Sequence, residues 1–125
     1  MRRNVLRREG KTMPKFLISF PSSAMNLTPE ELEEAVNDSH AVWREAVDAG
    51  VWVFGGAIDE DTAPVIVEAD GAMTRGTYPD SGKLDGGFAI FDVPTYEEAV
   101  EWAAKIAKAC KCPQELRIFS DDPEA

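Results

Sequence analysis

A single histidine is the side chain of this sequence best suited to exchanging protons near neutral pH. His40 falls in a segment of helical periodicity, about 80° from Leu32 around the helix axis, at the border of an apolar stripe. An imidazole placed there can reach into a cleft between a helix and a sheet, or it can be an ordinary boundary residue. An orienting carboxylate could come from Asp59 or Asp85, and spacing does not choose between them.

Two other residues could contact a substrate. Arg75, in a predicted strand, could pair with a substrate carboxylate or stabilise an enolate oxygen, although a strand arginine is more often in a surface ion pair. Trp52 alternates with its strand neighbours, so it belongs to one face of a sheet, where it could line a cavity or contact a second subunit. Trp43 lies on an apolar helix face, and we expect it in the core.

The composition argues against several other classes of function. One histidine and two cysteines do not complete a four-ligand zinc site, and no phosphate-binding glycine loop occurs, so we expect no metal and no cofactor. A net charge of −10 disfavours nucleic acid and anionic membranes as partners, and no apolar run is long enough to span a bilayer. Cys110 and Cys112 are expected to be reduced thiols in the cytoplasm, because a disulfide across one residue is strained.

The length of 125 residues suits one domain with a short segment at each end. Residues 1–13 hold five basic residues and one acidic residue; we expect a flexible basic leader, with Met13 as an alternative functional start. Residues 14–120 form the domain, and residues 121–125 form an acidic tail.

Apolar runs and capping signals predict an alternation of strands and helices. Thr28 and Thr95 each begin a capping box, and Asp70-Gly71 predicts a hairpin turn. The helix stripe of Leu32, Val36, Trp43 and Val47 is expected to pack on a sheet, and Ala35, Ser39 and Ala46 extend that stripe on one side. The strand over 51–58 is apolar in nearly every position, as a strand covered on both faces would be. The expected strands are 15–20, 51–58, 64–69, 72–75, 87–93 and 115–119, and the expected helices are 29–49 and 96–109.

This order predicts an α+β fold of the ferredoxin-like βαββαβ type, with an extra hairpin arm between the second and third core strands. Its helices would cover one face of the sheet and leave the other face bare. The bare face must bury against something, most simply a second copy of the chain, so we expect a homodimer.

The stretch from Phe16 to Phe119 resembles the YCII-related family, also called DGPF proteins. The resemblance rests on K-F-L-I-S-F, T-P-E-E with a histidine late in the helix, A-G-V-W-V-F-G-G, and L-D-G-G-F-A-I-F-D-V followed by E-E-A-V-E-W-A. It implies a dimeric α/β barrel. Some members act on small, often aromatic, molecules, including removal of HCl from a chlorinated hydroquinone, with a histidine and an aspartate as the acid–base pair.

The motif that names this family departs from its pattern here. Counted back without gaps from Gly86, the D-G-P-F tetrapeptide falls on Arg75-Gly76-Thr77-Tyr78, so the glycine and the aromatic match and Arg75 replaces the carboxylate. The alternative, Asp70-Gly71-Ala72-Met73, keeps the carboxylate but requires a loop insertion. With the ungapped placement, Arg75 and Tyr78 become candidate substrate-binding residues, together with Trp52.

Two hypotheses of different classes follow. The first is a cofactor-free lyase or isomerase in which His40, with Asp59 or Asp85, acts as general acid and base on a small aromatic or enolisable substrate. The alternative is a non-catalytic ligand-binding or accessory homodimer whose acid–base pair is degenerate. A protein-interaction subunit is a third possibility, which no residue singles out.

Overall fold

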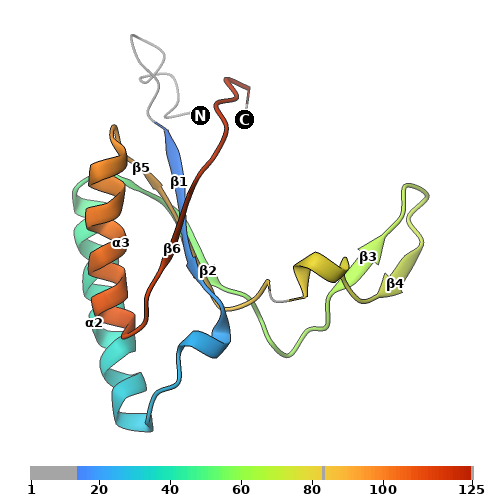
Figure 1. Cartoon of the computed structure of the whole chain (residues 1–125), viewed down its shortest axis with the longest axis horizontal. Helices are drawn as coiled ribbons and strands as arrows, with labels where there is room; N and C mark the ends of the chain where they lie inside the picture. Colours follow the sequence, from blue (N-terminus) through green and yellow to red (C-terminus); the bar gives the residue numbers. More distant parts are fainter. Residues whose placement is uncertain (1–13, 83, 125) are drawn as a thin grey trace.

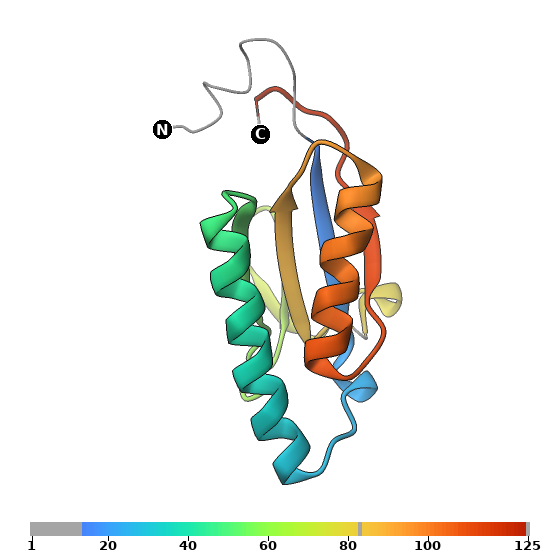
Figure 2. The same cartoon turned by 90° about the vertical axis from the view of Figure 1, so that its left-hand side faces the viewer.

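A four-stranded antiparallel sheet with two helices on one face forms the body of the protein (Figures 1 and 2). The computed structural model describes residues 14–82 and 84–124, so the predicted leader, residues 1–13, lies outside the described residues. The strands pair in the order β2-β5-β1-β6. The α+β class is confirmed. The body elements are β1 (Lys15–Phe20), η1 (Ser22–Ala24), α2 (Pro29–Asp48), β2 (Trp52–Ala57), β5 (Gly87–Asp92), α3 (Tyr96–Cys110) and β6 (Glu115–Ile118).

Both helices begin where their capping residues predict. The Thr28 hydroxyl accepts from the Glu31 amide at 3.1 Å, and the Glu31 carboxylate accepts from the Thr28 amide at 2.9 Å, which completes a capping box. At α3 only half of the predicted box forms. The Thr95 hydroxyl accepts from the Glu98 amide, but the Glu98 carboxylate accepts from that same hydroxyl instead of from the Thr95 amide.

The inward line of α2 lies at one side of the predicted stripe, along the small residues that extend it. Ala35 and Ala46 are the residues of α2 that are fully buried, with Ser39 and Val42 between them half-buried. Small side chains allow the helix backbone to approach its neighbours closely, and the large apolar side chains then flank the contact instead of filling it. Four residues predicted to pack on the sheet are therefore between 44 and 48% exposed: Leu32, Val36, Trp43 and Val47.

The described residues of the chain cover β2 on one face only. Among the strands that the structure describes, β2 pairs with β5 alone and forms an edge of the sheet, and its Phe54 side chain is 64% exposed. The face that carries Phe54 has no helix over it among residues 14–82 and 84–124. An apolar run in sequence shows that a strand avoids water, but it does not show whether the same chain supplies the cover.

The core lies between the helices and the covered face of the sheet. Phe91 is fully buried at its centre, where its ring meets Trp52 edge-on at 5.6 Å and Trp102 at 5.3 Å between centroids. Phe16, Ile18 and Val93 are buried beside it.

The predicted hairpin is present as a separate arm that projects from the body (Figure 1). β3 (Val65–Val67) and β4 (Met73–Arg75) pair as a two-stranded sheet, and the short helix η2 (Pro79–Ser81) follows them. At the turn, Asp70 Oδ1 accepts from the Ala72 amide at 2.9 Å and Gly71 has a φ of +92°, as the Asp-Gly signal predicts. Within the described ranges, neither long helix combines the length and apolar character needed to cross a bilayer.

Candidate functional site

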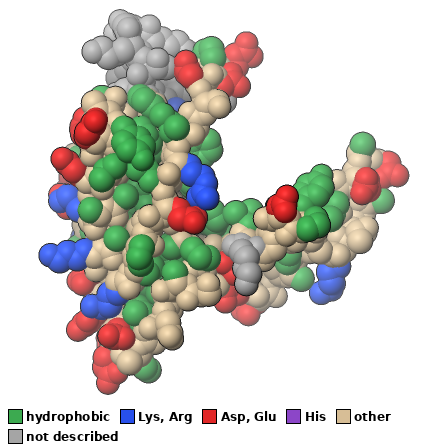
Figure 3. All heavy atoms as spheres, in the orientation of Figure 1, with side chains coloured by type: hydrophobic (Ala, Val, Ile, Leu, Met, Phe, Trp, Pro, Cys, Tyr) green, Lys and Arg blue, Asp and Glu red, His purple; other side chains and the backbone are tan. Residues whose placement is uncertain are grey.

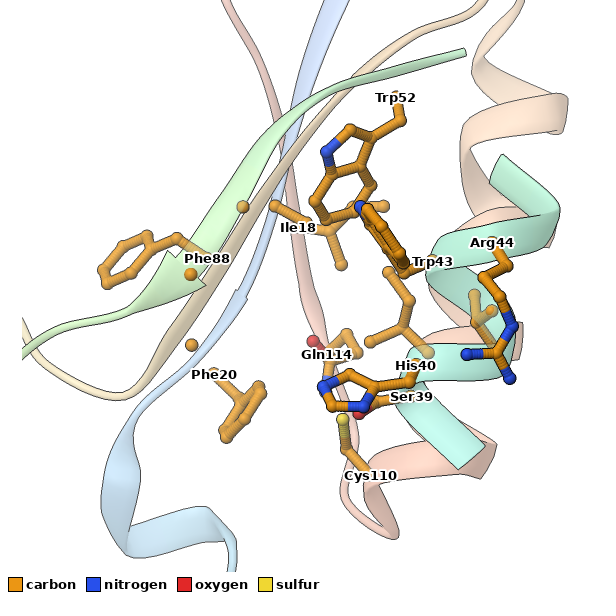
Figure 4. A pocket seen from close by; sticks show the side chains of 16 residues that line it. Ile18, Phe20, Ser39, His40, Trp43, Arg44, Trp52, Phe88, Cys110 and Gln114 are labelled. Carbon is orange, nitrogen blue, oxygen red and sulfur yellow. The ribbon is translucent and has the colours of Figure 1, made fainter. Parts of the chain in front are cut away.

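A cavity of about 490 Å³ opens between α2, the end of α3 and the helix-covered face of the sheet (Figure 4). Its aromatic walls come from three elements: Phe20 ends β1, Trp43 lies on α2 and Trp52 begins β2. Phe88 also borders the cavity, but its ring lies on the other side of the strands. Further apolar surface comes from Ile18, Val42, Ala89 and Ile106.

Gly55 allows Trp52 to lie flat along this wall. A Cβ atom at Gly55 would overlap the six-membered ring of Trp52, so the indole occupies space that any other residue would need. A shift in strand register between Trp52 and Phe54 gives β2 the twist that brings Trp52 to the covered face. Of the glycine pair predicted to mark a bulge or a close approach, Gly55 therefore accommodates a close approach by the Trp52 side chain of its own strand, and Gly56 has no close neighbour.

Asp85-Gly86-Gly87 fixes the Phe20 side of the cavity. Asp85 accepts from the Ser22 amide at 3.0 Å and from the Ser22 hydroxyl at 2.8 Å. Gly86 packs directly on the backbone of residues 20–22, where a side chain would collide, and Gly87 packs on the Phe20 ring. This contact joins the start of β5 to the turn after β1, and so it positions Phe20. Asp85 therefore has a structural role, because its hydrogen bonds to Ser22 hold this turn against the start of β5.

His40 lines the cavity from α2, as its place at the edge of the apolar stripe suggested. Figure 4 shows its ring on the same side of the cavity as Cys110 and Gln114. No acidic residue among those that the structure describes lines this cavity. The imidazole therefore borders a site with a cationic rim residue, Arg44, and without a carboxylate.

The structure brings neither candidate carboxylate to His40. Asp59 lies in an exposed turn, where its carboxylate accepts from the Thr62 hydroxyl at 2.7 Å and from the Asp61 amide at 3.0 Å. The Thr62 hydrogen bond, followed by the Asp61 hydrogen bond, lowers the pKa of Asp59 below its ordinary value. Asp85 is held by Ser22, and both aspartates lie outside the cavity lining.

The other predicted binding residues are divided between two parts of the molecule. Trp52 lines the cavity, as proposed from its alternation. Arg75 ends β4 of the arm, and Tyr78 is exposed just before η2, so neither belongs to the cavity lining. Trp43, expected in the core, is instead part of the cavity wall and 44% exposed.

Phe20, Cys110 and Gln114 are cavity residues that the sequence did not reveal. Burial, followed by the nearby Cys112, raises the pKa of the Cys110 thiol to about 11, and burial also raises that of Cys112. Cys110 thus presents a neutral thiol to the cavity at neutral pH. The Gln114 amide donates to the Cys112 carbonyl at 3.2 Å, which orients it at the end of α3. Phe20 lies opposite Gly87 in the antiparallel register of β1 with β5, and the sequence pattern does not specify that register.

Comparison of the sequence with models of protein families and with curated proteins finds no match.

Proposed function

We propose that this protein binds a small aromatic molecule in the cavity between α2, α3 and the sheet. The observation that supports this most directly is the wall of three aromatic rings, Phe20, Trp43 and Trp52, around a cavity of about 490 Å³. Protein sites for small molecules have volumes of about 300–1,000 Å³ and are mainly apolar with a few polar groups. His40, Gln114 and the Cys110 thiol would be those polar groups.

The charge of the lining favours a neutral or acidic ligand. The chain carries 23 acidic residues, and none within the described ranges lines the cavity, whereas His40 and Arg44 do. A ligand amine would meet no counter-charge there, while a phenolate or carboxylate would be attracted. Phenols and aromatic carboxylic acids are therefore the first class of ligand to screen.

Filling the cavity from α2 is expected to abolish this binding. Ser39 lines the cavity, and its hydroxyl donates only to the Val36 carbonyl of its own helix, so Ser39→Leu inserts volume at little cost to folding. We expect the affinity for an aromatic acid, measured by quenching of tryptophan fluorescence, to fall at least about tenfold because a well-filled cavity must expel part of the ligand.

Asn37→Leu is the matched control, since the same residue is introduced on the same helix at an exposed position outside the cavity. It is expected to leave the affinity unchanged. Equal affinities for wild type and Ser39→Leu would place the ligand elsewhere, and no binding by any phenol or aromatic acid to the wild type would overturn the proposal.

A second candidate function is proton transfer by His40, in a cofactor-free lyase or isomerase. It is favoured because the only histidine of the chain lines the cavity, and it agrees with the resemblance to the YCII-related family. With Asp59 and Asp85 held by other partners, the imidazole would exchange its proton directly with substrate and solvent. The non-catalytic alternative is favoured by the same lack of a carboxylate.

Once a substrate is found, His40→Gln is expected to lower kcat about 10²–10⁴-fold, because glutamine keeps hydrogen-bonding capacity but does not exchange a proton. The dissociation constant of the substrate should change little. Asp38→Asn, an exposed neighbour outside the cavity, is the control. An unaltered kcat in His40→Gln would remove His40 from the chemistry and overturn this candidate function.

We also propose a fold type, an oligomeric state and a cellular location for this protein. The strand order β2-β5-β1-β6, with both helices on one face, supports a ferredoxin-like plan with an added arm, and a dimeric α/β barrel would cover the other face. That face presents Leu17, Phe54, Phe88 and Ile90 together, so we propose a homodimer formed across it. We propose the cytoplasm as its location, in line with two free thiols.

A further inference from the structure

The arm carries apolar side chains that the described residues of the chain leave exposed. The cross-strand register places Val67 opposite Met73 and Val65 opposite Arg75, so these side chains share one face, while Ile66 and Thr74 share the other. Val65, Val67 and Met73 are 48, 60 and 69% exposed. Figure 3 shows hydrophobic side chains gathered along the arm on the side turned toward the angle between arm and body. An isolated two-stranded hairpin is at best marginally stable in water, so this face needs a partner.

The ends of the arm are fixed so that it points away from its own sheet. The Ile58 amide donates to the Gly86 carbonyl at 2.8 Å, which ties the outgoing and returning strands together. Asp85 then ties the returning strand to Ser22. Because both ends are held at the edge of the body, the arm extends from the face that lacks helices (Figure 1). The apolar face of the arm and the uncovered face of the sheet thus border the same space.

The uncovered face of the sheet has fewer residues than a stable protein interface uses, so an interface there needs the arm as well. Because strand residues alternate between faces, the four strands present about ten residues on the uncovered side. A stable interface uses about 20–30 residues from each partner, so the sheet alone is too small. The charges on this side are balanced, with Arg117 paired to Glu115 at 3.0 Å and Lys15 at 3.9 Å from Asp92, so two copies would not repel one another there. A second copy of the chain can therefore pack on the uncovered face of the sheet, and the arm supplies the additional contact area that the interface needs.

We propose that residues 64–76 form a clasp, which packs the Val65, Val67 and Met73 face against a second copy of the chain. The inference rests on the homodimer proposed above and specifies how that dimer is held. In a two-fold dimer the contact occurs twice, since the arm of each chain grips the other chain. The arm of the partner would add apolar surface that the small sheets lack.

The clasp is tested by introducing charge on one face of the arm. Val67→Glu with Met73→Glu is expected to raise the dimer dissociation constant at least about tenfold in sedimentation velocity over a dilution series, because two carboxylates would lose their hydration in the contact. Thr74→Glu, exposed on the opposite face of the same arm, is the matched control and should leave the dissociation constant unchanged. The wild type is expected at twice the chain mass of 13.7 kDa.

A second measurement does not depend on the variants folding well. Benzoylphenylalanine placed at position 67 should, on illumination, yield a covalent product of doubled mass. A wild type that stays monomeric at every dilution would overturn the homodimer and the clasp together. A dimer whose dissociation constant is the same in the double variant, and which gives no product between chains, would overturn the clasp alone.

Discussion

Phe91→Ala is expected to lower the free energy of unfolding by about 3–5 kcal/mol, the usual cost of removing a fully buried phenylalanine ring. Phe91 has no exposed surface and packs against Trp52 and Trp102, so its removal leaves a cavity between two large rings. Most domains are stable by only about 5–15 kcal/mol, so a large part of the native stability would be lost. Urea unfolding followed by circular dichroism, at a fixed protein concentration, measures the change.

Phe119→Ala is the matched control, because the same atoms are removed from a residue that is 45% exposed beyond the end of β6. We expect it to cost about 1 kcal/mol or less. Similar losses for Phe91→Ala and Phe119→Ala would contradict a core centred on Phe91. Tryptophan fluorescence should also change in Phe91→Ala alone, since Trp52 and Trp102 touch the deleted ring.

Gly86→Ala is expected to destabilise the protein by at least about 2–3 kcal/mol, the sum of backbone strain and overpacking. Gly86 has a φ of +85°, and a Cβ atom there would lie 2.7 Å from the Ser22 amide nitrogen and collide with the Phe20 carbonyl. The turn after β1 would have to move, and the Asp85 hydrogen bonds to Ser22 would be strained with it. Because Phe20 lines the cavity, ligand affinity should fall as well.

Two other glycines separate the contributions to this effect. Gly71→Ala carries the same kind of strain, with a φ of +92°, but nothing lies within 4 Å of the added carbon, so only the backbone cost of about 1–2 kcal/mol is expected. Gly56→Ala has neither strain nor contact and should be nearly neutral. Urea unfolding of the three variants checks the ranking. A cost for Gly86→Ala no larger than that for Gly71→Ala would show that the turn after β1 yields easily.

Local signals in the sequence were sufficient to predict the elements and their order. β1 has the predicted bounds Lys15–Phe20, and α2 and α3 begin directly after Thr28 and Thr95. The Asp70-Gly71 turn formed as predicted. These features depend on a few neighbouring residues: a hydroxyl that accepts from an amide three residues away, or a glycine that adopts a positive φ. Both partners of such an interaction lie within a few residues of each other, so the local sequence alone specifies it.

The site depended on contacts between residues far apart in the sequence. Helical periodicity predicted that His40 lies at the edge of an apolar helix face, and in the structure His40 lines the cavity. The sequence could not predict where the carboxylates of Asp59 and Asp85 lie relative to it. Asp85 accepts hydrogen bonds from Ser22, which is 63 positions away in the sequence, and Asp59 accepts from residues of its own turn. A carboxylate accepts from whichever donors the fold brings nearest, and spacing along the chain does not record which those are.

The sequence by itself determined that this is an acidic α+β domain with two capped helices, a hairpin and one imidazole at the border of an apolar helix stripe. Tertiary structure decided that β2 is an edge strand and that the alanine side of the apolar stripe of α2, not its large residues, is buried. It also decided that Arg75 and Tyr78 lie apart from the cavity with His40. The physical reason is the range of the interactions. Capping and turns act within a few residues, whereas burial and side-chain pairing are set by which segments pack together in space.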